Sequence, residues 1–156
     1  MTDARLAALE SLYRSRFPVF LRVAIGILRD DDRARDAVQE GFANAIRERR
    51  RFRGEGPLEA WVWRMVVNAA LRLARAEPAR IVAHPANGAA PEAAPDVRGP
   101  IAALPERQRL VLFLRYYGDL DYRAIADALE ISAGTVGATL HAAHETLRQQ
   151  LEEVPR

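Results

Sequence analysis

The stretch from residue 77 to residue 99 constrains the fold of this chain more than any other feature. It reads EPARIVAHPANGAAPEAAPDVRG, which is rich in proline, alanine and glycine and poor in large apolar side chains. Such a segment buries too little apolar surface to offset the entropy lost on ordering, so we expect a flexible linker. It divides the 156 residues into two parts, 1–76 and 100–156, and we expect each part to be a small domain.

Apolar residues recur at helical spacing in the first part, without strand-like alternation longer than a few residues. Pro18 follows one apolar stripe and is predicted to begin a second helix. Asp30 to Asp32 are predicted to supply the cap of the next helix, and the pair Gly54 and Gly56 is predicted to break the chain before a helix from Pro57 to Arg75. The expected fold class is therefore all-α.

The second part carries the pattern of a helix-turn-helix. Gly118 is predicted to end a first helix, and Asp121 to cap a short one that stops at Leu129. Residues 130–132 form the turn, and Ser132 is predicted to cap a last helix over residues 133–151. Two helices joined by a short turn are a common device for entering a DNA groove, so this part is a candidate DNA-binding domain.

Charge is distributed unevenly along the chain. All 23 basic residues are arginine; residues 1–76 hold 15 of them against 10 acidic residues, a net charge of +5. Residues 100–156 hold 6 arginines against 8 acidic residues, a net charge of −2. The first part therefore has the electrostatics of a nucleic-acid binder, and the helix-turn-helix part does not.

One face of the helix from Pro57 to Arg75 is a candidate nucleic-acid surface. Steps of four, three and four place Arg64, Asn68, Leu71 and Arg75 in a single stripe, where arginine suits phosphates and asparagine suits a base edge. Trp63 and Val67 lie beyond this stripe and are expected to be exposed, with Trp63 able to stack on an unpaired base. The expected core face of this helix consists of Leu58, Trp61, Val62, Met65, Ala69 and Leu73. A merely solvated helix face is the alternative interpretation of the stripe.

Several classes of protein are disfavoured. The absence of cysteine excludes disulfides and thiolate metal sites. No apolar run approaches membrane-spanning length and the first residues do not resemble a signal peptide, so we expect a cytoplasmic protein without membrane insertion. His141 and His144 lack an evident third ligand, and no nucleophile–base arrangement or phosphate-binding glycine loop is present. We expect neither a metal nor a cofactor, and no enzymatic activity.

Taken in order, the motifs resemble the extracytoplasmic-function (ECF) sigma factors, a subfamily of the sigma-70 family of bacterial RNA polymerase subunits. The resemblance covers both parts and most of the chain. Its motifs are DAVQEGF at residues 36–42, EAWVWRMVVNAAL at 59–71, LPERQR at 104–109, YRAIA at 122–126 and GTV at 134–136. Each motif is weak alone, whereas the ordered set with one linker between them is specific.

The resemblance implies a promoter-specificity subunit. Residues 1–76 would bind core RNA polymerase and read the −10 promoter element, and residues 100–156 would read the −35 element. By family resemblance the polymerase contacts would be Asp36, Gln39, Glu40 and Phe42. The implied DNA contacts are Arg53, Trp63, Arg64, Asn68, Leu71 and Arg75, and on the last helix Ser132, Thr135, Thr139 and His141. An anti-sigma protein is a further candidate partner.

The last helix departs from the family pattern. Where relatives carry basic side chains, this chain has Gly137, Ala138 and His144, and the usual turn glycine is Glu130. Fewer phosphate contacts predict weak or unusual −35 recognition. One alternative function is a stand-alone helix-turn-helix regulator, for which a more basic second part would be expected. The other is a degenerate sigma-like protein that acts chiefly through protein–protein contacts.

Overall fold

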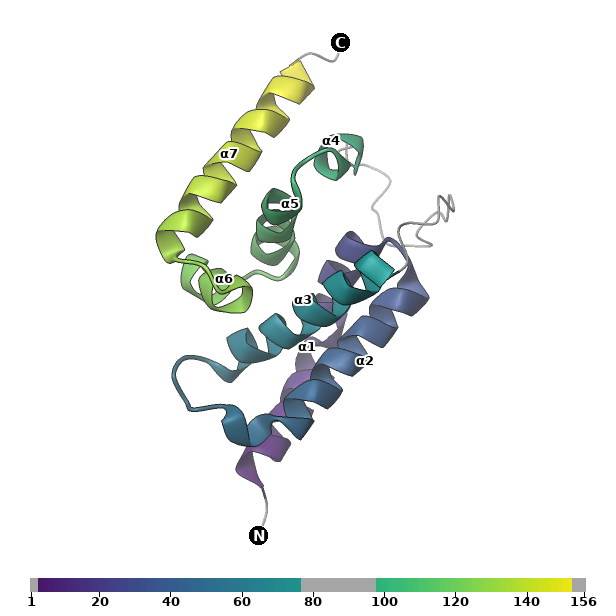
Figure 1. Ribbon diagram of the computed structural model, residues 1–156, viewed down its shortest axis with the longest axis vertical. Coiled ribbons are helices and arrows are strands. Elements are labelled where there is room, and N and C mark those ends of the chain that lie inside the picture. Colours follow the sequence, from purple (N-terminus) through teal and green to yellow (C-terminus); the bar gives the residue numbers. More distant parts are fainter. Residues whose placement is uncertain (1–2, 77–97, 153–156) are drawn as a thin grey trace.

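The computed structural model describes residues 3–76 and 98–152, which are helical with short connections and contain no strand (Figure 1). The first unit comprises α1 (Ala4–Leu28), α2 (Asp31–Arg47), the 3-10 turn η1 (Arg49–Arg51) and α3 (Leu58–Ala76). The second unit comprises α4 (Arg98–Ala102), α5 (Glu106–Leu112), the π-helical turn η2 (Phe113–Tyr117), α6 (Tyr122–Leu129) and α7 (Ala133–Glu152). The expected all-α class and the helix-turn-helix are confirmed. Most of the expected linker, residues 77–97, lies outside the described residues, and its last two residues begin α4.

Side-chain caps are present at the helix starts where the sequence predicted them. The Asp30 carboxylate accepts from the backbone N–H groups of Asp32 and Arg33 at 2.9 and 3.1 Å and so begins α2. Asp121 accepts from the Ala124 N–H at 2.8 Å ahead of α6, and the Ser132 hydroxyl accepts from the Thr135 N–H at 3.0 Å ahead of α7. Each cap satisfies N–H groups that a helix start leaves without partners.

The chain takes left-handed backbone conformations at both predicted breaks, the glycine pair before α3 and the turn after α6. Gly54 and Gly56 have φ of +76° and +98°, in the loop between η1 and α3, where glycine carries no steric penalty. Glu130 ends α6 with φ of +59° and ψ of +43°, and its N–H donates to the Ala126 carbonyl. A side chain in this conformation is strained, because the Cβ atom approaches the following carbonyl.

The prediction that Pro18 begins a second helix is wrong. Pro18 lies inside α1, which continues unbroken from Ala4 to Leu28. An interior proline removes one helical hydrogen bond and costs about 3 kcal/mol. Leu9 before the proline and Phe20 and Val23 after it are all buried in one core. Packing on both sides of Pro18 therefore overrides the local penalty.

Aromatic rings form the centre of the first unit. Phe20 stacks on Trp63 with ring centroids 4.0 Å apart, and meets Phe42 edge-on at 5.1 Å. Tyr13 also meets Phe42 edge-on, with ring centroids 5.1 Å apart. At Gly41, an added Cβ would lie only 2.6 Å from a methyl group of Val66, so α2 and α3 approach as closely as a glycine permits. These contacts bind α1, α2 and α3 into one packed bundle.

The core face expected for α3 is wrong in part. Trp63 and Val67 were expected to be exposed, but they are 0% and 1% exposed. Val62 and Ala69 are buried as expected, whereas Trp61 and Met65 are only half-buried. A single amphipathic arc does not describe α3, because it contacts α1 and α2 on one side and α6 of the second unit on another. Figure 1 shows α6 lying beside the N-terminal half of α3.

Candidate nucleic-acid interface

The predicted stripe on α3 has two arginines that contact the second unit and one exposed asparagine. Arg75 donates to the Glu106 carboxylate of α5 at 3.2 Å, and both side chains are exposed. Asn68 is exposed, and Leu71 beside it is half-buried. Asn68 is therefore the polar group of this stripe that a base edge could reach in the observed arrangement.

Arg64 faces the helix-turn-helix. Its Nε and Nη2 donate to the backbone carbonyl of Asp127 in α6 at 3.1 and 2.8 Å. Its Nη1 also lies 3.4 Å from the Glu130 carboxylate in the turn. A guanidinium that donates from two nitrogens to one carbonyl is held in a defined orientation. Arg64 therefore points at the second unit in this structure.

The loop before α3 presents a basic residue beside an aromatic contact. Arg53 is exposed, between η1 and Gly54. Phe52 is half-buried, and its ring lies 5.5 Å from that of Trp61 on α3. This contact fixes the start of the loop on α3, while Arg53 stays accessible to an anion such as a phosphate.

An acidic surface lies on α2, in the middle of the helix. Asp36 and Gln39 are exposed, and the half-buried Glu40 forms an ion pair with Arg72 of α3. Phe42 was predicted to belong to this surface as a polymerase contact. The structure places it in the aromatic core at 3% exposure, so its ring stabilises the bundle and is not presented to a partner.

The start of α7 presents small polar groups. Ser132 is exposed and its hydroxyl lies 2.8 Å from that of Thr135, which with Thr139 is half-buried. His141, two positions after Thr139, is exposed. Arg148, the single basic residue other than histidine between residues 133 and 152, is ion-paired with Glu145 at 2.8 Å. This helix surface therefore offers hydrogen bonds and little positive charge.

Metal and membrane sites receive no support from the described residues. Within residues 3–76 and 98–152, no three His, Cys, Asp or Glu side chains gather where a metal ion could be held. His144, one of the two histidines considered above, lies with Nε2 2.8 Å from the Tyr116 hydroxyl. No helix in the same ranges is long and apolar enough to cross a membrane.

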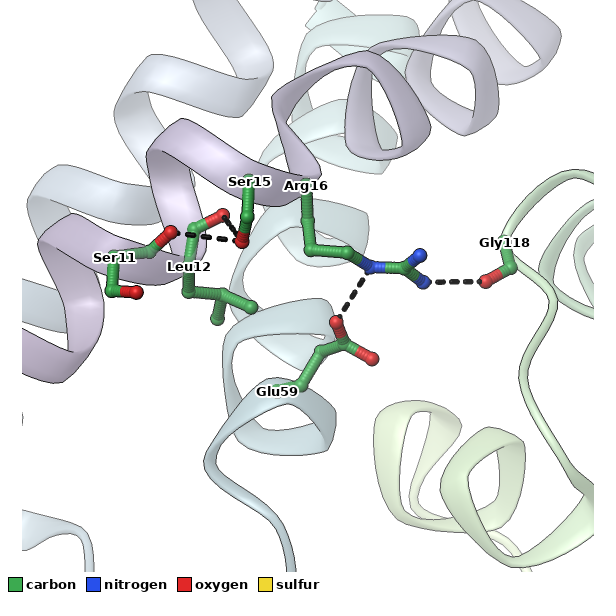
Figure 2. Close-up of polar contacts among 6 residues, drawn as sticks. All are labelled: Ser11, Leu12, Ser15, Arg16, Glu59 and Gly118. Carbon is green, nitrogen blue, oxygen red and sulfur yellow. Dashed lines mark hydrogen bonds and ion pairs between the residues drawn. The ribbon is translucent and has the colours of Figure 1, made fainter.

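Sequence reasoning missed Arg16 entirely. Its Nε donates to Glu59 of α3 at 2.9 Å, and its Nη2 donates to the Gly118 carbonyl of the second unit at 3.1 Å (Figure 2). Its partners lie 43 and 102 positions away along the chain, so no local pattern could indicate them. The contacts of Asp127 and Phe113 with the first unit could not be predicted either, because their partners are also distant in the sequence.

Comparison with known proteins gives consistent matches for the two units. Residues 12–79 match the family "Sigma-70 region 2", and residues 101–147 match "Sigma-70, region 4". The chain is 27% identical to the RNA polymerase sigma-H factor of Pseudomonas aeruginosa, over 87% of this chain and 82% of that protein. It is 26% identical to the RNA polymerase sigma-E factor of Streptomyces antibioticus, over 97% of this chain and 89% of the relative.

Two solved structures share the fold. One is CnrH in complex with the cytosolic domain of CnrY, with a TM-score of 0.70 and 18% identity, covering 96% of this chain and 91% of that one. The other is the sigma factor RpoE in complex with the anti-sigma factor NepR from Bartonella quintana, with a TM-score of 0.70 and 20% identity, covering 94% and 99%.

Proposed function

This chain belongs to the extracytoplasmic-function sigma factors of the sigma-70 family, RNA polymerase subunits for transcription initiation, and we propose how its two units divide that work. Residues 1–76 bind core RNA polymerase and read the −10 element, and residues 100–156 read the −35 element. Residues 77–99 connect the two readers. Sigma factors act on polymerase and DNA, so its place of action is the cytoplasm.

The proposed polymerase contact is the exposed acidic surface of α2. Asp36 and Gln39 are exposed on the same helix, and Glu40 beside them is held by Arg72. Charged and polar groups that complement the partner's surface favour fast and specific association. Phe42 is left out of this contact because its ring is buried.

The proposed −10 reader is α3 with the loop before it. The observation that carries it is the exposure of Asn68 on a helix whose other side is locked into an aromatic core. A rigid helix holds the amide in a fixed position, as reading of a base edge requires. Arg53 in the loop is placed to bind a backbone phosphate.

The proposed −35 reader is α7, and we propose that it binds weakly. Ser132, Thr135, Thr139 and His141 supply hydrogen-bonding groups, while Arg148 is already paired with Glu145. Binding with few cationic contacts has a shallow dependence on salt, because few counterions are released. A measured dependence as steep as that of a helix with several arginines on this face would contradict the proposal.

An anti-sigma protein is a proposed partner as well. The fold is shared over nearly the whole chain with RpoE, which was solved in complex with an anti-sigma factor. Such a partner would be detected by capture with the purified full chain followed by competition with core polymerase. Competition is expected, because both would use the exposed surfaces of the two units.

The polymerase contact is tested by co-elution of the full chain with core RNA polymerase on a sizing column. We expect a stoichiometric complex, and its loss in the double variant Asp36→Ala/Gln39→Ala. The matched control is Glu10→Ala/Ser11→Ala, which removes one carboxylate and one polar group from exposed positions of α1. A well-folded chain that fails to bind polymerase would overturn the proposal and favour a stand-alone regulator or a protein that binds another partner.

A further inference from the structure

The arginines around the turn that follows α2 have unequal surroundings. Five of the seven residues from 47 to 53, which read RERRRFR, are arginine. Arg50 and Arg53 are exposed, and neither side chain forms a hydrogen bond or ion pair within residues 3–76 and 98–152. The side chain of Arg49, by contrast, is only 25% exposed. One arginine of this basic segment is therefore turned toward the protein.

Asp3, just before α1, holds Arg49 in this orientation. The Arg49 Nε donates to the Asp3 carboxylate at 2.5 Å, and its Nη1 donates to the carbonyl of Ile46 near the end of α2 at 2.7 Å. Figure 1 shows the start of α1 beside the turn that follows α2. One guanidinium therefore joins the start of α1, the end of α2 and η1, and its charge is compensated by a carboxylate.

The two oxygens of the Asp3 carboxylate have different partners. Oδ1 caps α1 by accepting from the backbone N–H groups of Arg5 and Leu6 at 3.0 and 3.3 Å, whereas Oδ2 accepts from Arg49. An asparagine at this position would keep an oxygen for the cap and lose the negative charge. Asp3 also lies outside residues 12–79, the range that matches region 2. The ion pair therefore constrains the matched domain from outside it and can be removed without removing the cap.

Arg49 is one of two anchors for the loop before α3. The backbone N–H of Phe52 donates to the Arg49 carbonyl at 3.3 Å, so the loop starts directly from this residue. The second anchor is the contact of the Phe52 ring with Trp61, with centroids 5.5 Å apart. Further along, Gly54 and Gly56 give the loop few conformational constraints of its own. The orientation of the loop therefore depends on how Arg49 is held.

Ion pairing also decides which of these arginines contribute to phosphate binding. A cationic side chain that contacts a phosphate releases a counterion from the nucleic acid, and this release drives much of the binding. An arginine that is already neutralised by a carboxylate brings no net charge to the phosphate and releases no counterion. Arg50 and Arg53 are available for such contacts, whereas Arg49 is withheld by Asp3.

We infer that Asp3 is a positioning residue for the −10 reader, an inference that rests on the proposed function. It turns Arg49 inward, neutralises it, and so limits the phosphate contacts of this segment to Arg50 and Arg53. Phosphate contacts are the same for every sequence, whereas base contacts differ between sequences. With fewer phosphate contacts, a larger share of the binding free energy comes from base contacts such as the one proposed for Asn68.

The test measures how salt weakens binding of single-stranded DNA by the complex of the full chain with core RNA polymerase. The probe is a fluorescent oligo-dT strand, and its anisotropy gives the affinity at each salt concentration. Asp3→Asn keeps the cap of α1 and releases Arg49, so the slope of log affinity against log salt should steepen by roughly 0.7, the value for one additional phosphate contact on a single strand. An unchanged slope, with the helical content retained, would overturn the inference.

Two further variants identify the source of the additional contact. In the double variant Asp3→Asn/Arg49→Gln the slope should return to that of the unaltered chain, and a slope that stays steep would overturn the inference, because another group would then be the source. The matched control is Asp32→Asn, which removes the same charge from an exposed position in the first turn of α2, at the opposite end of that helix from Arg49. Its slope should not change. An equal steepening in this control would assign the effect to net charge and overturn the role of Asp3.

Sequence selection separates failure of this inference from failure of the proposed function. The complex of the full chain with core polymerase should enrich particular sequences from a pool of random single strands, and core polymerase alone should not. If the complex enriches nothing beyond what core polymerase enriches, the proposed −10 reader is overturned, and the role of Asp3 with it. If enrichment occurs while Asp3→Asn leaves the salt dependence unchanged, only the role of Asp3 is overturned.

Discussion

The aromatic core of the first unit and the contact that Arg64 makes with the second unit are held by different kinds of interaction. In the core, Phe20 stacks on a fully buried Trp63 at 4.0 Å, and Phe42 closes the cluster edge-on. At the second contact, Arg64 donates to the Asp127 carbonyl while its side chain is 34% exposed, and its ionic partner Glu130 is 67% exposed. The first contact excludes water and the second does not.

The difference indicates which contact can be reversible. Burial of a large apolar side chain contributes about 1.5 to 3 kcal/mol, and that contribution is lost whenever water enters. An exposed ion pair contributes about 0 to 1 kcal/mol, because water and salt screen it. We therefore expect the ion pair between Arg64 and Glu130 to break more readily than the aromatic core of the first unit.

The largest expected effect is on the aromatic core. Trp63→Ala should lower the free energy of unfolding of the full chain by about 3 to 5 kcal/mol, because it leaves a cavity beside Phe20. Urea titration followed by circular dichroism measures it. Trp61→Ala is the matched control and should cost less, since Trp61 is half-buried. Equal losses in the two variants would remove the distinction between core and surface of α3.

A second change tests the close approach of α2 to α3. Gly41→Ala places a methyl group within 2.7 Å of the Val66 backbone and should cost about 1 to 3 kcal/mol through overpacking. The same titration measures it, with Gly99→Ala as the control, because that position opens onto empty space. A neutral Gly41→Ala would mean that the two helices can slide apart at no cost.

A third change should stabilise the second unit and weaken its contact with Arg64 of the first unit. Glu130→Gly relieves a left-handed backbone conformation and should stabilise the second unit by about 1 kcal/mol. It also removes the carboxylate beside Arg64, so the distance distribution between spin labels on cysteines introduced at the exposed positions Ser11 and Arg123 should broaden. Arg29→Gly is the matched control, because it relieves the same conformation at the end of α1. If the distance distribution of the Arg29→Gly variant broadened as well, loss of the Glu130 carboxylate would not be the cause of the broadening.

The smallest effect concerns a polar contact inside the first unit. The Asp3 carboxylate accepts a hydrogen bond from the Arg49 guanidinium and another from the backbone N–H of Leu6. These bonds hold the pKa of Asp3 below its ordinary value of 3.8. Because the pKa is lower in the folded state, ionised Asp3 stabilises the fold at every pH above its unfolded-state pKa. This stabilisation is lost as the pH falls through the folded-state pKa. Asp3→Asn should therefore flatten the loss of thermal stability below about pH 4.

The matched variant for this last change is Arg49→Gln, which removes the donor and keeps the carboxylate. It should also flatten the acid dependence of the melting temperature. The double variant should add little to either single one, because both remove one interaction. Additive effects would mean that the Asp3–Arg49 contact does not cause the lowered pKa.

Local signals in the sequence were enough for the fold class and for most helix ends, but not for the boundary expected at Pro18. Asp121 and Ser132 cap the helices they were expected to cap, and Asp30 is the member of the expected run 30–32 that caps α2. Gly118 and Glu130 end the helices before them. Each of these depends on side chains and backbone groups within a few residues of one another, so the pattern that predicts them is complete in a short window. The candidate DNA and polymerase residues remain predictions, apart from Trp63 and Phe42, which the structure places in the core.

What surrounds each helix was decided only by the tertiary structure. Pro18 continues a helix because residues on both sides of it reach one core, and Trp63 is buried because α3 packs against α1 and α2 while α6 covers another side. Arg16 and Arg64 donate to backbone carbonyls of the second unit, which lie 102 and 63 positions away along the chain. A helical period identifies apolar faces but not which neighbours will cover them, and that depends on contacts between segments distant in the chain.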